Sequence, residues 1–141
     1  MKLLFVCHGN ICRSPMAEYV MKDMVKKAGL ADRVQIASAA TSREELGNGI
    51  YPPAQRELQA HGIAFDTHRA RQITRADVSA FDRIYYMDSR NRSNLRRMFP
   101  DWDNFYPFLP RDVADPWYSG DFSQTWEDIT TGCKRILEEL L

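Results

Sequence analysis

The sequence predicts an α/β fold, in which a parallel sheet carries helices on both faces. Short apolar runs, typical of buried strands, alternate along the chain with longer segments whose apolar residues recur at helical spacing. Such alternation favours parallel strands joined by helical crossovers. No linker or repeat divides the chain. We therefore expect a single three-layer αβα domain over residues 1–141, with a doubly wound four-stranded sheet in the order 2-1-3-4.

Four segments have the character of strands. Residues 2–6 form a short apolar run rich in branched side chains, and residues 34–38 alternate between apolar and polar side chains. Residues 83–87 predict a third strand. Residues 104–109 predict a weaker fourth strand, because Pro107 interrupts it and cannot donate a ladder hydrogen bond.

Helix signals follow the first two strands. Ser14 and Pro15 predict the start of a first helix, since serine caps helices and proline is tolerated in their first turn. Apolar residues continue at helical spacing up to Gly29, which suits a helix end. Residues 52–62 predict a short helix that two prolines open and a glycine closes.

The second half of the chain carries three more helix signals. Thr74 begins a capping box, and Asp88 is expected to cap a helix that ends near residue 98. Residues 112–121 are expected to form a loop. Residues 122–141 place their apolar side chains on one side and predict a long amphipathic helix.

Charge and cysteine content narrow the possible functions. Lysine plus arginine and aspartate plus glutamate number 19 each, so no basic excess favours a nucleic acid or a membrane surface as partner. Three cysteines do not make a disulfide framework, and reduced thiols fit a reducing compartment. The apolar run at the N-terminus is too short for a signal peptide. We therefore expect a cytoplasmic protein.

The loop after the first strand carries the strongest chemical signal, the run Cys7-His8-Gly9-Asn10-Ile11-Cys12-Arg13. Backbone N–H groups converge at a strand-to-helix loop, and the helix N-terminus favours a bound phosphate. Gly9 and Asn10 accept the backbone angles of a tight turn whose N–H groups point inward. Arg13 can hold two phosphate oxygens, and Cys7 can attack phosphorus as a thiolate. The hydroxyl of Ser14 and the helix N-terminus favour that thiolate.

Residues 6–18 are similar to the N-terminal signature of the low-molecular-weight protein tyrosine phosphatases. Further similarity follows in the family's order, at residues 38–42, 68–73, 86–88 and 115–118. The resemblance covers essentially the whole chain. It implies hydrolysis of phosphotyrosine in proteins, without a metal or an organic cofactor.

The resemblance also implies a role for individual residues. Cys7 would form a phosphocysteine, Arg13 would bind the phosphate, and Asp115 would serve as general acid and then general base. Asn10 would be held in place by three side chains, Ser14, Ser38 and His68. The other loop residues would contact the phosphate, and two aromatic residues would stack against the phosphotyrosine ring. These residues are His8, Gly9, Ile11 and Cys12 in the loop, and Trp117 and Tyr118 after Asp115.

One segment departs from the family's pattern. Many members carry an aromatic residue in the loop after the second strand, where it shapes the mouth of the site. Here that stretch is Ser42-Arg43-Glu44-Glu45-Leu46. Its charges are expected to alter which peptides are accepted, and the direction of that effect stays open at this stage.

Other interpretations compete with catalysis at Cys7. A zinc site built from Cys7, His8 and Cys12 lacks the fourth ligand that a structural site needs. Cys12 either packs or, as the resemblance implies, pairs reversibly with Cys7 under oxidant. Arsenate reduction on the same scaffold needs relay cysteines midway along the chain, and residues 80–97 contain none. A phosphate-binding module without turnover would need neither Cys7 nor Asp115.

The remaining polar residues have simpler interpretations. Cys133 is expected to pack in the core, because it lies on the apolar side of the last helix. His68 is read either as a partner of Asn10 or as a core histidine. The arginines are expected to form solvated faces; they are Arg69, Arg71, Arg75, Arg90, Arg92, Arg96 and Arg97.

Overall fold

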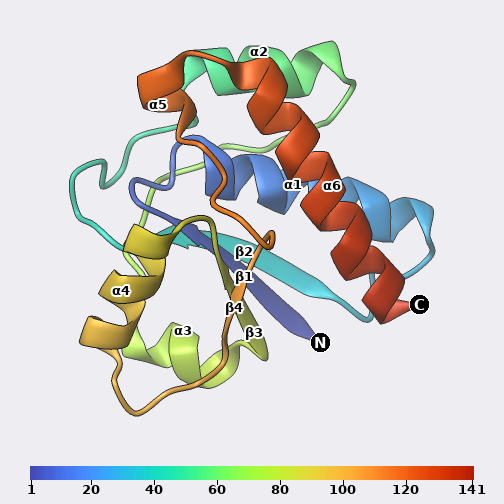
Figure 1. Ribbon diagram of the computed structural model, residues 1–141. Coiled ribbons are helices and arrows are strands. Elements are labelled where there is room, and N and C mark those ends of the chain that lie inside the picture. Colours follow the sequence, from blue (N-terminus) through green and yellow to red (C-terminus); the bar gives the residue numbers. More distant parts are fainter.

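The computed structural model describes residues 1–141 and contains a four-stranded, all-parallel sheet between two layers of helices (Figure 1). The observed strand order, β2-β1-β3-β4, confirms the predicted fold class and order. β1 is central and pairs with β2 on one side and with β3 on the other. The strands are β1 (Lys2–Cys7), β2 (Gln35–Ala40), β3 (Arg83–Tyr86) and β4 (Phe105–Pro107).

The central strand β1 contributes side chains to two separate apolar clusters, one on each face of the sheet. Leu3 and Phe5 belong to the larger cluster, whereas Leu4 and Val6 belong to the smaller one. All four side chains are fully buried. A continuous apolar run is what a strand buried on both faces requires, because successive side chains point to opposite faces.

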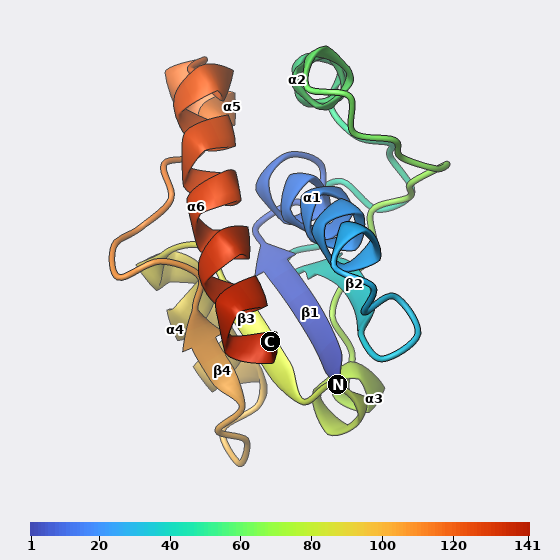
Figure 2. The same cartoon turned by 90° about the vertical axis from the view of Figure 1, so that its right-hand side faces the viewer.

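Helices cover both faces of the sheet (Figure 2). Met16 of α1 and Ile129 of α6 lie in the larger cluster, whereas Val78 of α3 and Leu95 of α4 lie in the smaller one. α2 packs outside α1 and α6. The helices are α1 (Arg13–Lys27), α2 (Pro52–Ala60), α3 (Arg75–Ala80), α4 (Ser89–Met98), α5 (Pro116–Ser119) and α6 (Phe122–Leu140).

Two local predictions about helices were wrong, and two were confirmed. α1 begins at Arg13 with Cys12 as its N-cap, so Ser14 is not the cap but the second residue of the helix. The segment expected to be a loop contains the short helix α5, which Asp115 caps. The capping box expected at Thr74 and the helix cap expected at Asp88 are both present, and the cap at Asp88 is also a capping box.

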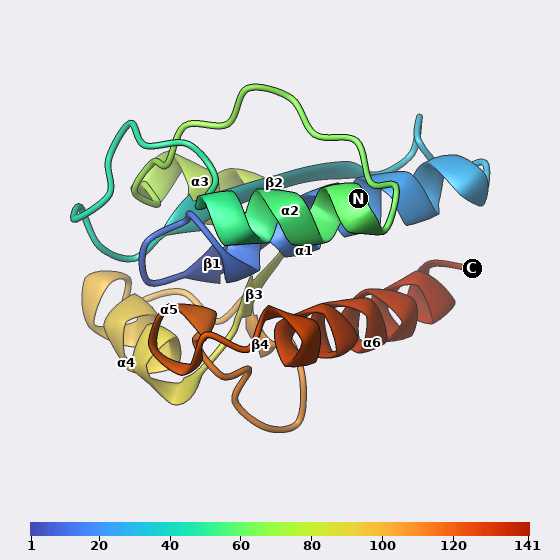
Figure 3. The same ribbon diagram turned by 90° about the horizontal axis from the view of Figure 1, so that it is seen from above.

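The sheet topology places the 7–13 loop at a switch point. The chain leaves β1 through α1 to reach β2 on one side, and later returns to β3 on the other side of β1. Ligands of doubly wound folds bind at the carboxyl ends of the strands beside such a reversal. Seen from above, α4, α5, the 7–13 loop and the 41–51 loop gather at one end, away from both termini (Figure 3). No helix is long and apolar enough to span a membrane.

Candidate active site

The 7–13 loop joins the end of β1 to the first turn of α1. Cys7 is the last residue of β1, and Arg13 is the first residue of α1. The N-cap Cys12 makes no side-chain hydrogen bond to the helix, so no side chain caps the N–H groups of the first turn. The backbone N–H of Asn10 donates to Cys7 Sγ at 3.3 Å. One backbone donor of this loop therefore points at the sulfur atom.

Asn10 fixes the shape of the loop from inside the protein. It is the one residue other than glycine with a positive φ, 61°, and its side chain is fully buried. Its amide nitrogen donates to Ser14 Oγ at 2.8 Å and to Ser38 Oγ at 3.0 Å. The backbone N–H of Arg71 donates to Asn10 Oδ1, and His68 Nε2 donates to the Asn10 carbonyl oxygen at 2.7 Å. Three separate segments thus hold one left-handed residue.

A chain of hydrogen bonds leads from a buried carboxylate to the Cys7 sulfur. Glu18 accepts from Ser38 Oγ at 2.6 Å, which leaves the lone pairs of that hydroxyl for Asn10. Asn10 in turn donates to Ser14 Oγ, which lies 3.0 Å from Cys7 Sγ. Because Ser14 already accepts a hydrogen bond from Asn10, its own hydrogen is free to point at a thiolate.

Arg13, which follows β1, bonds to residues that follow β3 and β4. Its side chain is 2 % exposed. Nη1 donates to Asp88 Oδ2 at 2.7 Å and to the carbonyl oxygen of Val113 at 2.8 Å, while Nη2 lies 3.4 Å from Asp115 Oδ2. Burial disfavours the charged guanidinium, but the facing Cys7, Asp115 and Asp88 outweigh it and keep the pKa of Arg13 above its ordinary value. The positive charge is therefore firmly retained.

Asp115 is presented by the start of α5. Its Oδ1 accepts from the backbone N–H of Trp117 at 3.1 Å, and Pro116, at the first helical position, is buried. The two aromatic residues that follow are largely in solvent, with 52 % of Trp117 and 80 % of Tyr118 exposed. The Trp117 ring lies 4.7 Å from the Tyr51 ring, measured between centroids.

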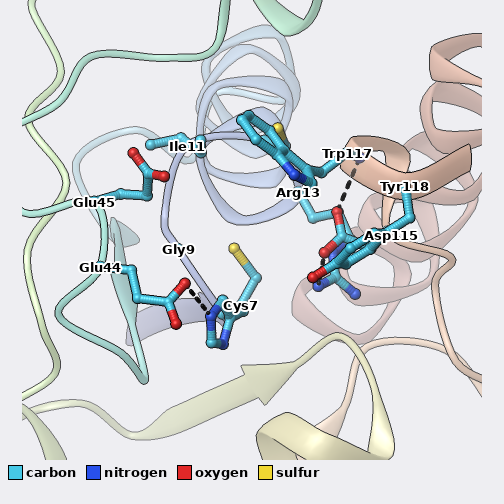
Figure 4. Close-up of a pocket in the computed structure, with 11 residues that line it drawn as sticks. Cys7, Gly9, Ile11, Arg13, Glu44, Glu45, Asp115, Trp117 and Tyr118 are labelled. Atoms are coloured by element: carbon cyan, nitrogen blue, oxygen red, sulfur yellow. Dashed lines mark hydrogen bonds and ion pairs between the residues drawn. The ribbon is translucent and has the colours of Figure 1, made fainter. Parts of the chain in front are cut away.

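These groups surround a cavity of about 130 Å³ at the end of the sheet (Figure 4). Cys7 lies at its floor, Glu44 and Glu45 on one side, and Asp115, Trp117 and Tyr118 on the other. Its lining comprises Cys7, His8, Gly9, Ile11, Cys12, Arg13, Glu44, Glu45, Asp115, Trp117 and Tyr118. The other four predicted site residues do not line it but are joined to one another by hydrogen bonds at Asn10; they are Asn10, Ser14, Ser38 and His68.

Three residues at the site were missed by the sequence analysis. Asp88 was predicted as a helix cap and lies within the family resemblance at residues 86–88, but its pairing with Arg13 was not predicted. Glu18 was quoted within a motif without a role, although a glutamate one turn after Ser14 on a buried helix was a usable signal. Tyr51 carried no signal. The Arg71 side chain is 41 % exposed, as expected of a solvated face, but it also pairs with Asp77, and the Arg71 backbone N–H donates to Asn10.

The three cysteines occupy different environments, and all are free thiols. Cys12 packs against Ile11 and Ala70, and burial, with the nearby Cys7 and Asp115, raises its pKa. Cys133 is fully buried in the larger apolar cluster, as predicted, and burial raises its pKa also. A thiol buried in this way is poorly placed to relay a disulfide from Cys7. No cluster of three or more histidine, cysteine or acidic side chains has metal-binding geometry.

Comparisons with known proteins agree with this geometry. The sequence model of the family described as "Low molecular weight phosphotyrosine protein phosphatase" matches residues 2–141. The low-molecular-weight protein-tyrosine-phosphatase YfkJ of Bacillus subtilis is 37 % identical, over 98 % of this chain and 94 % of its own. The rat low-molecular-weight phosphotyrosine protein phosphatase is 38 % identical, over 97 % and 94 %. The crystal structure of a Streptococcus pyogenes member, SP-PTP, superposes with a TM-score of 0.94 at 43 % identity, over 99 % and 93 %.

Proposed function

Because this chain belongs to the low-molecular-weight phosphotyrosine protein phosphatase family and is a protein-tyrosine-phosphatase, we propose that it hydrolyses phosphotyrosine through a phosphocysteine on Cys7. One observation carries this proposal: a single cavity is lined by a thiol, a guanidinium and a carboxylate, those of Cys7, Arg13 and Asp115. These are the nucleophile, the phosphate clamp and the proton donor that the reaction needs.

The first step transfers the phosphoryl group from tyrosine to Cys7. The phosphate sits on the N–H groups of the 7–13 loop and on Arg13, whose long 3.4 Å contact with Asp115 gives way to phosphate oxygens. The Cys7 thiolate attacks phosphorus, so the S–P bond forms while the bond from phosphorus to the tyrosine oxygen breaks. Asp115 donates its proton to that oxygen, and tyrosine leaves as the neutral phenol.

The second step regenerates the enzyme. The Asp115 carboxylate takes a proton from water, and the water oxygen attacks phosphorus. The S–P bond breaks, so inorganic phosphate and the Cys7 thiolate are released. The Ser14 hydroxyl, 3.0 Å from the sulfur, stabilises the thiolate both before attack and as the leaving group.

The surrounding residues hold the reacting groups and the substrate in position. Asn10, held by Ser14, Ser38 and His68, keeps the loop's N–H groups turned toward the phosphate. Asp88 fixes one end of the Arg13 guanidinium. Trp117 and Tyr118 form the wall against which the phosphotyrosine ring stacks. Because a working thiolate requires reducing conditions, a cytoplasmic location belongs to the same proposal.

The decisive experiment follows phosphate release from phosphotyrosine and from p-nitrophenyl phosphate, without added metal. The unaltered protein is expected to turn over both substrates, and Cys7→Ser is expected to abolish turnover. Cys133→Ala, which removes a thiol from the core, is the matched control and retains activity. Circular dichroism of each variant establishes that it is folded. Full activity of folded Cys7→Ser would overturn the proposal.

A further inference from the structure

The 41–51 loop carries two adjacent carboxylates onto the mouth of the active-site cavity. Glu44 and Glu45 both line it, on the side opposite Trp117 and Tyr118 (Figure 4). A peptide whose phosphotyrosine reaches Cys7 must pass between these two sides. The residues next to the phosphotyrosine in that peptide therefore come close to both carboxylates.

Neither carboxylate is neutralised by lysine or arginine. Glu44 Oε2 lies 2.9 Å from His8 Nε2, and its side chain is 69 % exposed. Glu45 Oε2 accepts from the Asn48 amide at 2.6 Å, which satisfies a lone pair but leaves the negative charge. The neighbouring Arg43 is exposed and does not line the cavity. Arg13, the guanidinium of the cavity, is paired with Asp88 and Asp115 and faces the phosphate position.

The loop that carries the carboxylates is anchored by hydrogen bonds. The backbone N–H and the hydroxyl of Ser42 both donate to the carbonyl oxygen of His8, at 3.1 and 2.8 Å. Farther along the loop, the Gly47 N–H donates to the carbonyl oxygen of Ala70, and the Ala70 N–H donates to the carbonyl oxygen of Asn48. The backbone that carries both carboxylates is therefore anchored beside the phosphate site, so a bound peptide meets a negative potential at this side of the cavity.

We infer that Glu44 and Glu45 make the enzyme prefer phosphotyrosine peptides with lysine or arginine next to the phosphotyrosine over peptides with acidic neighbours. This inference rests on the proposed function. A phosphate dianion is itself repelled by the carboxylates, and a basic neighbour in the substrate offsets that repulsion. An acidic neighbour adds to it. A solvent-exposed charge pair of this kind changes affinity by about 2- to 5-fold. Two carboxylates therefore give a difference in kcat/KM of about 10-fold between basic and acidic peptides.

The test compares three phosphotyrosine peptides that differ only in flanking residues, which are arginine, serine or glutamate. For each peptide, kcat/KM is measured at low salt for the unaltered enzyme and for Glu44→Gln, Glu45→Gln and the double variant. Glu138→Gln is the matched control, because it removes an exposed carboxylate at the C-terminal end of α6, far from the cavity. Turnover of p-nitrophenyl phosphate by the unaltered enzyme reports on the proposed function alone.

The unaltered enzyme and Glu138→Gln are expected to favour the arginine peptide over the glutamate peptide by about 10-fold. The double variant is expected to reduce this ratio to about 2-fold, and 1 M salt to do the same, because charges in solvent are then screened within about 3 Å. Equal kcat/KM for the three peptides, with p-nitrophenyl phosphate still turned over, would refute the inference and leave the proposed function intact. The inference would also be refuted if Glu138→Gln lowered the ratio of kcat/KM between the arginine and glutamate peptides as much as the double variant does.

Discussion

Asp115 is the residue whose role is most directly tested by kinetics. Asp115→Asn keeps the size of the side chain but cannot donate a proton, so we expect kcat for phosphotyrosine to fall by about 10²- to 10⁴-fold. The loss should be smaller for p-nitrophenyl phosphate, because its leaving group is stable as an anion. A series of aryl phosphates, plotted against leaving-group acidity, measures this difference. An equal loss across the series would exclude Asp115 as the acid.

Cysteine alkylation separates the reactive thiol from the inert ones. Burial raises the pKa of Cys12 and of Cys133, so both stay protonated at neutral pH. We expect iodoacetate to modify one cysteine, Cys7, in the folded protein and all three after denaturation. Inorganic phosphate should slow the alkylation of Cys7 in the folded protein, because it occupies the 7–13 loop. Peptide mass mapping identifies the modified residue, and preferential labelling of Cys12 or Cys133 would contradict the assignment.

At the scale of single residues, the sequence predicted those side chains whose signal is local. Cys7 and Arg13 stand at the two ends of a strand-to-helix loop, and Asp115 precedes a proline and two aromatic residues. The contact between Asp88 and Arg13 could not be predicted in this way. It joins residues 75 positions apart and depends on which strands become neighbours in the sheet.

The capping box of α3 links a surface helix to the active site and to acid stability. Asp77 accepts from the backbone of Thr74 at 2.8 Å and from Arg71 at 2.7 Å, and the Arg71 N–H holds Asn10. Burial by itself raises the pKa of Asp77, but the hydrogen bonds and charge of Arg71 and Thr74 outweigh it and hold the pKa below its usual value. The folded state therefore binds this proton less readily than the unfolded state.

Asp77→Asn tests this linkage by urea unfolding at two pH values. The lowered pKa stabilises the fold above the ordinary aspartate value of about 3.9, and this stabilisation is lost as the pH falls through the native value. We expect the variant to be about 1 kcal/mol less stable at pH 7, since it weakens a cap. The difference from the unaltered protein should shrink at pH 3. An unchanged difference at both values would show that the charge of Asp77 contributes nothing.

The contact between α6 and the segment after β4 leaves no room for a side chain at Gly132. A Cβ atom at this position would overlap the ring of Phe108, which is 2 % exposed and packs against Phe5. We expect Gly132→Ala to lower the free energy of unfolding by about 2 kcal/mol, because displacing the ring costs more than the helix gains from alanine. Thr131→Ala, on the exposed side of the same helix, should change it by less than about 0.5 kcal/mol. Urea unfolding of the two variants gives the comparison, and equal stabilities would contradict the packing argument.

Periodicity predicted the long elements well and the short ones poorly. α6 begins at the expected Phe122, because its apolar stripe extends over many turns. α5 has four residues, too few to show any period. The start of α1 was misplaced because Ser14 has the properties of a cap, yet its hydroxyl is used by Asn10 and Cys7.

Across the whole molecule, Arg13 follows β1 and contacts residues that follow β3 and β4, and we expect a phosphate ion in the 7–13 loop to bind beside its guanidinium. A ligand that binds only the folded state raises the free energy of unfolding, by about 2.7 kcal/mol at one hundred times its dissociation constant. We expect inorganic phosphate at that level to raise Tm by roughly 5–10 °C. Differential scanning calorimetry measures the shift, with chloride at equal ionic strength as the control. The same shift in both salts would argue against a specific anion site.

The contacts of the buried Asn10 join parts of the chain that are far apart in sequence. The backbone of Asn10 is left-handed, a conformation that asparagine tolerates better than most residues, and its partners Ser38, His68 and Arg71 lie 28, 58 and 61 positions away. The β1-α1-β2 unit can therefore form early without giving a working loop. A nascent chain that has not yet reached residue 68 carries the nucleophile and the arginine but not the contacts that hold the loop's shape. We therefore expect catalysis to recover on refolding only once these long-range contacts have formed, and a chain that stops before residue 68 to be inactive.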